Sequence, residues 1–333
     1  MSTPTLRSVH VDSALTNMSI AYIQKKTNFI ATQVFPLVEV DFSSDVYFTF
    51  DQGDFNRDEA RLRAPGTESA GGGFKITKDQ AYNCAVTAFH HDIDMQKLKN
   101  ADRVINLERT AVQFVTNKLL MRRELDWVDK YFKAGVWSAG DIAGVASAPS
   151  TNQVLQWNDA NSDPILNVSN GKSAILQRTG FEPNVLVLGF EVYEQLRNHP
   201  DIIERVKYVQ NIGANQAVKV NSQALADLFD VERVLVSKAI QNTAYEGQTD
   251  APSFIAGKRA LLAYAAPEAA LEMPSAGYTF SWQRYVESRD PNGIGFDQFP
   301  MPHLKAQRVE GEMAIDQKLI SGALGYFWTS IVA

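Results

Sequence analysis

The chain has 333 residues, of which 45% are hydrophobic and 21% are charged, as in an ordinary soluble globular protein. Its formal net charge of −6 argues against a protein that grips nucleic acid through a broad basic face. The single cysteine, Cys84, excludes an intrachain disulfide, and no apolar run reaches the roughly 18 residues of a membrane span.

Residues 1–44 predict an N-terminal arm. Short apolar patches, Ser19–Ile23 and Phe29–Ala31, are separated by polar residues and are too small to bury themselves. They need a surface elsewhere, either on this subunit or on a neighbour. We therefore take Tyr22 and Phe35 as candidate contacts between subunits.

Residues 45–80 predict a long hairpin with a charged end. The stretch Val46–Phe50 is rich in strand formers, and 74–77 can pair back onto it. The loop 51–73 is longer than structureless loops usually are, which favours a functional loop over the alternative of a plain disordered insertion. Its charges are our main candidate intersubunit contacts: Asp54, Arg57, Asp58, Glu59, Arg61 and Arg63.

Residues 102–134 predict one long helix, because apolar residues recur there at steps of three and four. Asn100 or Asp102 can cap its start and Gly135 can end it. At 1.5 Å per residue the helix is expected to be roughly 50 Å long. A coiled-coil seam is the alternative, but Lys118 interrupts the pattern.

The rest of the chain predicts a mixed body followed by returning strands. Helices are expected at 164–177, 191–198, 201–207 and 222–229, and strands at 82–88, 184–188, 231–237, 279–288, 303–317 and 323–332. Residues 180–275 are therefore an insertion between the long helix and the last strands. This alternation indicates an α+β fold.

No group of residues forms a convincing active site. Gly171-Lys172-Ser173 suggests a phosphate loop, but Leu166 occupies the position of the required first glycine. The adjacent His90 and His91 point to opposite sides of a strand and do not readily close one metal site. We therefore predict no catalytic residues, no cofactor site and no metal site, with a nucleotide-dependent enzyme as a remote alternative.

The order of these elements resembles the major capsid protein of tailed bacteriophages, with the Hong Kong 97-type capsid fold. Three stretches are similar to that family: the arm with Val34-Phe35-Pro36, the loop with Ala64-Pro65-Gly66-Thr67-Glu68, and Asn198-His199-Pro200-Asp201 in the inserted body. The resemblance implies an N-terminal arm (1–44), an extended loop hairpin (45–80), a peripheral domain (81–179 and 276–333) with a spine helix (102–134), and an α/β axial domain (180–275).

The resemblance also implies a function. Copies of the chain are expected to assemble into hexamers and pentamers, and then into an icosahedral head that encloses double-stranded DNA without sequence-specific binding. Scaffolding, portal and decoration proteins are expected partners, and the chain starts directly at the arm, so any scaffold is expected to be separate. The expected location is the virion capsid, assembled in the host cytoplasm, with no membrane partner. An encapsulin-like nanocompartment shell is the alternative.

Overall fold

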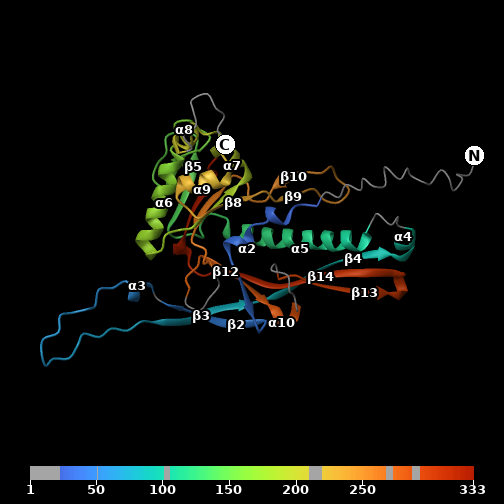
Figure 1. The fold of residues 1–333 in the computed structure, drawn as a ribbon, viewed down its shortest axis with the longest axis horizontal. Coiled ribbons are helices and arrows are strands. Elements are labelled where there is room, and N and C mark those ends of the chain that lie inside the picture. The colour runs from blue at the N-terminus through green and yellow to red at the C-terminus, as the bar shows by residue number, and fades with distance from the viewer. Residues whose placement is uncertain (1–22, 51, 101–105, 210–219, 268–272, 287–292) are drawn as a thin grey trace, which may run out of the picture.

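The computed structural model describes residues 23–50, 52–100, 106–209, 220–267, 273–286 and 293–333. Within these residues the chain forms two main β-sheets, a long helix beside the first sheet, and a hairpin that extends away from both (Figure 1). This arrangement confirms the expected α+β class.

The first sheet is built around one long strand, β14 (Ala306–Leu319). It pairs antiparallel with β4, β12 and β13, and β1 adds in parallel to β12. The remaining strands of this five-stranded sheet are β1 (Leu37–Val40), β4 (Ala85–Asp94), β12 (Gly277–Trp282) and β13 (Gly295–Met301). A short 3-10 turn, η3 (Pro302–Leu304), precedes β14.

Three strand predictions for this sheet have different outcomes. The strand expected at 303–317 is confirmed as β14. The strand expected at 279–288 is too long, because the backbone leaves β12 and turns into the short helix α10 (Gln283–Val286). The strand expected at 82–88 is divided at Cys84, where one strand ends and the next begins.

The long helix is confirmed as α5 (Leu107–Tyr131), but it is shorter than expected. Asn106 caps its start, because its side-chain oxygen accepts a hydrogen bond from the backbone N–H of Arg109 at 2.9 Å. Asn100 instead ends a separate short helix, α4 (Met95–Asn100), and Asp102 lies outside the described residues. The 25 residues of α5 span roughly 37 Å.

A glycine allows α5 to lie close against the first sheet. A Cβ atom at Gly311 of β14 would lie 2.6 Å from Cγ1 of Val115 and 3.0 Å from Cδ1 of Leu119. Both of these helix side chains are buried. The helix therefore packs against the sheet at a separation that a larger residue at position 311 would not allow.

The second sheet has six strands in the order β6-β5-β15-β11-β7-β8. Their bounds are β5 (Gly140–Val145), β6 (Gln153–Leu155), β7 (Val185–Gly189), β8 (Arg233–Ser237), β11 (Ala260–Ala263) and β15 (Gly325–Thr329). Strands β7 and β11 are buried throughout, as expected for central strands of Val, Leu and Ala. A 3-10 turn, η4 (Gly322–Leu324), leads into β15.

Four helices pack around this sheet, and a small hairpin extends from it (Figure 1). The helices are α6 (Pro164–Thr179), α7 (Phe190–Asn198), α8 (Pro200–Val209) and α9 (Ser222–Phe229). The small hairpin pairs β9 (Ile240–Asn242) with β10 (Pro252–Phe254). Each of the four helices expected from the sequence in this body is therefore present.

The last strand joins a different sheet from the one expected. The sequence analysis grouped 276–333 with the long helix, but β15 lies between β11 and β5 of the six-stranded sheet. Strands β5 and β6 also belong to this sheet, although they precede residue 180. The sequence analysis did not predict this sheet membership, because no local pattern in the sequence specifies which distant strands pair with each other.

The described part of the arm, from residue 23 onward, packs against its own subunit. From residue 23 it passes through a 3-10 turn, η2 (Lys26–Asn28), and a short helix, α2 (Ala31–Val34), before entering β1. Phe35 is 0% exposed, and its ring lies 6.0 Å from that of Trp127 and 5.0 Å from that of Tyr131 on α5. The expectation that Phe35 contacts a neighbouring subunit is therefore wrong, because its own core covers it. Tyr22 lies outside the described residues.

The extended hairpin pairs β2 (Ser44–Phe50) with β3 (Ile76–Asn83) and forms a separate two-stranded sheet. One short helix, α3 (Gln52–Phe55), follows β2. The stretch 56–75 between the helix and β3 has no helix or strand and forms the end of the projection in Figure 1. We call the segment 44–83 the hairpin.

Candidate assembly surfaces

One face of the hairpin is apolar and open to solvent. In β2 the side chains of Val46, Phe48 and Phe50 alternate with half-buried neighbours, and they are 48%, 54% and 40% exposed. Ile76 of β3 is paired with Phe50 and is 46% exposed. Successive side chains of a strand point to opposite faces, so these four lie on the same face of the ribbon.

The apolar face continues into the end of the hairpin through an aromatic cluster. Phe55 and Phe74 stack with ring centroids 5.5 Å apart, and each lies 5.9 Å from the ring of Phe50. Their exposed fractions are 60% and 57%. We call the whole set the apolar stripe: Val46, Phe48, Phe50, Phe55, Phe74 and Ile76. Contiguous apolar surface of this kind marks a site of interaction with another molecule.

The charges at the end of the hairpin are partly paired among themselves. Arg57 lies 3.5 Å from a carboxylate oxygen of Asp54 and 3.3 Å from one of Glu59. Asp54 also accepts a hydrogen bond at 3.0 Å from the backbone N–H of Lys75, across the loop. These contacts shape the loop itself, so they account for part of the charge that the sequence analysis assigned to neighbouring subunits.

The other candidate charges lie on the same loop. Arg63 donates a hydrogen bond at 2.5 Å to the carbonyl oxygen of Thr67, and Asp58 and Arg61 are exposed. Their contact with a neighbouring subunit stays a prediction. The sequence analysis missed the apolar stripe, although the alternation of Val46, Phe48 and Phe50 was visible as a signal.

The suspected phosphate loop lies within a helix. Asp163 caps the start of α6 and Gly180, with φ at 75°, ends it, so Gly171, Lys172 and Ser173 are interior helical residues. Gly171 faces the second sheet, where a Cβ atom would lie 3.1 Å from Trp328. Interior backbone N–H groups are already bonded along the helix and are not available to cradle a phosphate.

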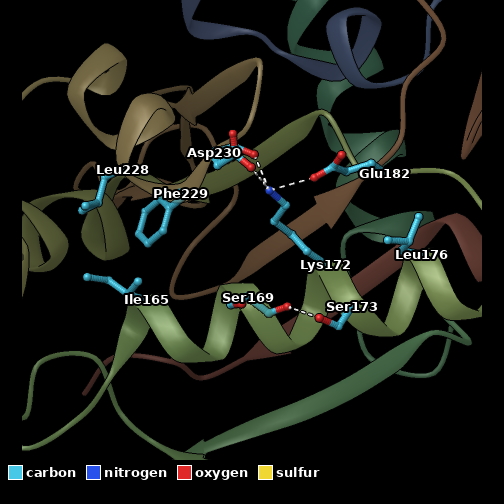
Figure 2. A pocket seen from close by; sticks show the side chains of 9 residues that line it. All are labelled: Ile165, Ser169, Lys172, Ser173, Leu176, Glu182, Leu228, Phe229 and Asp230. Atoms are coloured by element: carbon cyan, nitrogen blue, oxygen red, sulfur yellow. Dashed lines mark hydrogen bonds and ion pairs between the residues drawn. The ribbon is translucent and has the colours of Figure 1, made fainter.

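Lys172 is held by two acidic residues beside a groove between α6 and α9 (Figure 2). Its Nζ atom lies 2.6 Å from a carboxylate oxygen of Asp230 and 3.0 Å from one of Glu182. Burial lowers the pKa of Lys172, but hydrogen bonds to Asp230 and Glu182 outweigh this effect and raise the pKa overall. The groove has a volume of about 310 Å³. A lysine paired in this way has a structural role and is not free to bind phosphate.

Among the residues that the structure describes, the other perturbed titratable groups lie apart from one another and make structural contacts. Asp92 holds Arg308 through two hydrogen bonds of 2.7 and 2.8 Å, across β4 and β14. Burial raises the pKa of the Cys84 thiol to about 11, which keeps it protonated and unreactive. Within the described ranges, no cluster of three or more His, Cys, Asp or Glu residues is arranged to hold a metal ion. Over the same ranges, no helix has the length and apolar character needed to cross a membrane.

Two curated relatives match most of the chain. The major capsid protein of Burkholderia phage BcepMu is 26% identical over 278 residues, covering 81% of this chain and 82% of the relative. The major capsid protein of Pseudomonas phage JBD67 is 28% identical over 335 residues, covering 97% of each. No family model matches the chain.

Solved structures share the fold across nearly the whole chain. A phage-related protein from Bordetella bronchiseptica RB50 has a TM-score of 0.67 at 20% identity, covering 96% of this chain and 97% of that one. The capsid of cyanophage P-SCSP1u has a TM-score of 0.57 at 11% identity, covering 98% and 94%. An encapsulin from Synechococcus elongatus PCC 7942 has a TM-score of 0.53 at 8% identity, covering 97% of each chain.

The fold is therefore that of the Hong Kong 97-type capsid proteins, as the sequence predicted. Within that class, the curated relatives of this chain are major capsid proteins of phages. Both findings confirm the resemblance that was drawn from the arm, the loop and the inserted body.

Proposed function

We propose that this chain is the structural subunit of a phage head, and that its copies assemble into an icosahedral shell around double-stranded DNA. The match to two phage major capsid proteins over 81% and 97% of the chain carries this proposal. The chain then acts by binding copies of itself and not by catalysis. Its location is the virion, and assembly takes place in the host cytoplasm before or during packaging.

The apolar stripe supports self-assembly. The end of the hairpin extends away from both sheets (Figure 1), and the side chains of the stripe are exposed because the subunit's own core does not cover them. Burying apolar surface against another copy contributes about 25 cal/mol per Å², so a stripe of six large side chains is worth several kcal/mol per contact. In a shell every copy repeats the contact, and small gains per subunit decide whether the shell closes.

The net charge of −6 fits a shell that encloses DNA without gripping it. Proteins that bind the phosphate backbone tightly carry many lysine and arginine contacts and release counterions on binding. An acidic subunit lacks that driving force over most of its surface. We propose scaffolding, portal and decoration proteins as further partners of the complete head, whereas the shell itself is expected to form from copies of this chain.

The proposed domain division follows the observed sheets. The arm (1–44) and the extended loop (45–80) keep the bounds expected from the sequence, and the paired strands of the hairpin run slightly further, from Ser44 to Asn83. The peripheral domain combines α5 with the five-stranded sheet, including residues 81–134 and 276–319. The axial domain combines the six-stranded sheet with its helices, and so includes 140–267 together with the C-terminal strand β15.

A nanocompartment shell is the second candidate, because the encapsulin from Synechococcus elongatus shares the fold. Its identity of 8% is well below the 26% and 28% of the phage relatives, which favours the phage head. The contents of purified particles separate the two functions. Electron micrographs of the protein expressed alone test assembly, and particles from infected or induced cells test the contents. A phage head protein gives closed shells with double-stranded DNA, an encapsulin gives shells filled with protein, and an enzyme gives no shells.

A further inference from the structure

The end of the hairpin presents a leucine to solvent. Leu62 has a relative exposure of 105%, so its own subunit covers none of it. It lies in the stretch 56–75, which has no helix or strand and forms the end of the projection in Figure 1. A single exposed leucine is common on protein surfaces. Its role therefore depends on how the chain holds it and on which surface can receive it.

A hydrogen-bonded turn follows Leu62 and gives the end of the hairpin a local structure. The backbone N–H of Thr67 donates to the carbonyl oxygen of Ala64 at 3.2 Å, and Gly66 has φ at 80°. A proline in the second position and a glycine with positive φ in the third are typical of a type II turn. Leu62 is therefore presented beside a structured segment, which loses less conformational entropy on binding than a free chain does.

The groove between α6 and α9 offers an apolar end that can receive such a side chain. Ile165 of α6 and Leu228 and Phe229 of α9 gather at this end, as Figure 2 shows. Phe229 is buried, whereas Ile165 and Leu228 are half-buried. With a volume of about 310 Å³, the groove has room for a leucine side chain beside these three residues. A leucine placed there would leave water for an apolar surrounding, which is favourable.

The rim of the groove carries an excess of negative charge. Lys172 pairs with both Asp230 and Glu182, so the charge of one carboxylate is left over. The side chain of Asp230 is 88% exposed, against 15% for that of Lys172, so the carboxylate is the group that faces solvent. Lys172 uses the Oδ2 atom of Asp230, and Oδ1 has no hydrogen-bond or ion-pair partner among the described residues. This oxygen can accept hydrogen bonds from an incoming cation.

The end of the hairpin carries a matching cation next to Leu62. Arg61 is exposed, and within the described part of the chain it makes no hydrogen bond or ion pair. Arg57, by contrast, is already occupied by Asp54 and Glu59. A guanidinium group binds a carboxylate through charge-assisted hydrogen bonds. The hairpin therefore has an apolar side chain beside a positive charge, and the groove has an apolar end beside a negative charge.

We propose that the end of the hairpin of one copy docks in the groove between α6 and α9 of a neighbouring copy, with Leu62 at the apolar end and Arg61 against Asp230. This contact depends on the proposed function, because it exists only if copies of the chain assemble. A second copy is the partner because every subunit presents both surfaces, and the end of its hairpin extends away from its own sheets (Figure 1). The two surfaces differ, so the contact is head-to-tail, and such contacts close into rings when the rotation between copies fits.

Chemical cross-linking within assembled particles tests this placement. Ala60→Cys adds a thiol close to Leu62, and Ser169→Cys adds one at an exposed position in the groove. The natural Cys84 is buried and is expected to stay unmodified. In particles of the double variant, a short bismaleimide is expected to join neighbouring copies into a ladder of multimers on a denaturing gel. The control replaces Ser169→Cys by Ser222→Cys, at an exposed serine at the other end of α9, and is expected to lose the ladder.

The possible results separate this contact from the shell function. A natural chain that forms no particles would overturn the proposed function and the contact with it. Particles without a product that joins positions 60 and 169 would overturn the contact alone. Equal amounts of product in the control pair would also overturn it, because the end of the hairpin would then not be held in the groove.

A second measurement needs no added cysteine. Leu62→Ser is expected to raise the protein concentration at which particles form, measured by light scattering, on the order of tenfold, because the burial of a leucine is lost. Arg61→Gln and Asp230→Asn each remove one charge, and asparagine tolerates the left-handed φ of 52° at position 230. Each is expected to raise this concentration about threefold, which is typical of an exposed ion pair. Their combination is expected to be no worse than either alone, because both remove the same contact. An unchanged concentration for Leu62→Ser, or effects of the two charge variants that multiply, would contradict the docking.

Discussion

The apolar stripe gives the sharpest prediction about assembly. We consider the double substitution Phe55→Ser with Phe74→Ser, which removes the two most exposed phenylalanines of the aromatic cluster. A phenylalanine buries roughly 200 Å² when fully covered. With 60% and 57% of these residues exposed, a neighbouring copy can cover about 230 Å² of surface in the pair. At about 25 cal/mol per Å², complete coverage is worth up to about 6 kcal/mol per contact.

Even half of that coverage gives a large effect on assembly. About 3 kcal/mol corresponds to more than a 100-fold change in an equilibrium constant. The subunit itself is expected to tolerate the change, because both rings lie at the end of the hairpin and outside the core of either sheet. Its free energy of unfolding is expected to change by less than about 0.5 kcal/mol.

Light scattering against protein concentration measures the effect. The double variant is expected to require at least tenfold more protein before shells form, while its thermal unfolding measured by circular dichroism stays unchanged. Tyr245→Ser is the control, because Tyr245 is 84% exposed near the β9–β10 hairpin and outside the stripe. An unchanged threshold for the double variant, with correct folding, would refute the role given to the stripe.

Three further predictions concern single features. Arg57→Glu with Arg61→Glu is expected to weaken assembly most at low salt, and the difference from the natural chain is expected to shrink as salt rises, because salt screens both the lost attractions and the new repulsions; light scattering that matches the natural chain across a salt series would count against it. Lys172→Ala is expected to lower the free energy of unfolding, measured by thermal unfolding, by roughly 0–1 kcal/mol, because its partners Asp230 and Glu182 are largely exposed. Titration calorimetry is expected to show no ATP binding by the natural chain or by the variant. Gly311→Ala is expected to lower the free energy of unfolding by about 1–3 kcal/mol, because the added methyl group would overpack against Val115. Gly73→Ala is the control and is expected to show no such loss, because the space around Gly73 is open.

Local patterns in the sequence predicted the elements better than their partners. The three-to-four spacing of apolar residues was sufficient to predict α5, because a helix is stabilised within one segment. Its first residue was misplaced because the capping side chain is that of Asn106. Helix α6 was predicted closely, at 164–177 against the observed Pro164–Thr179, and the structure shows that Asp163 caps its start and Gly180 ends it.

Contacts between distant segments were not predictable in the same way. Phe35 was assigned to a neighbour because the arm has little apolar surface of its own, yet Trp127 and Tyr131 on α5 cover it. The membership of β15 in the second sheet likewise depends on pairing with β11 and β5. The contact of Glu124 with the arm was not predictable either, because a glutamate in a helix gives no sign that it accepts a hydrogen bond from Ile30, 94 residues away.

The most direct test of the shell function is a cryo-electron microscopy reconstruction of particles assembled from the natural chain. We predict a closed icosahedral shell in which another copy covers Phe48, Phe55 and Phe74 of each hairpin. If no particles form under conditions where the subunit is folded, that result would contradict the shell function. A closed shell in which these three side chains face solvent would contradict the account of how the subunits hold together.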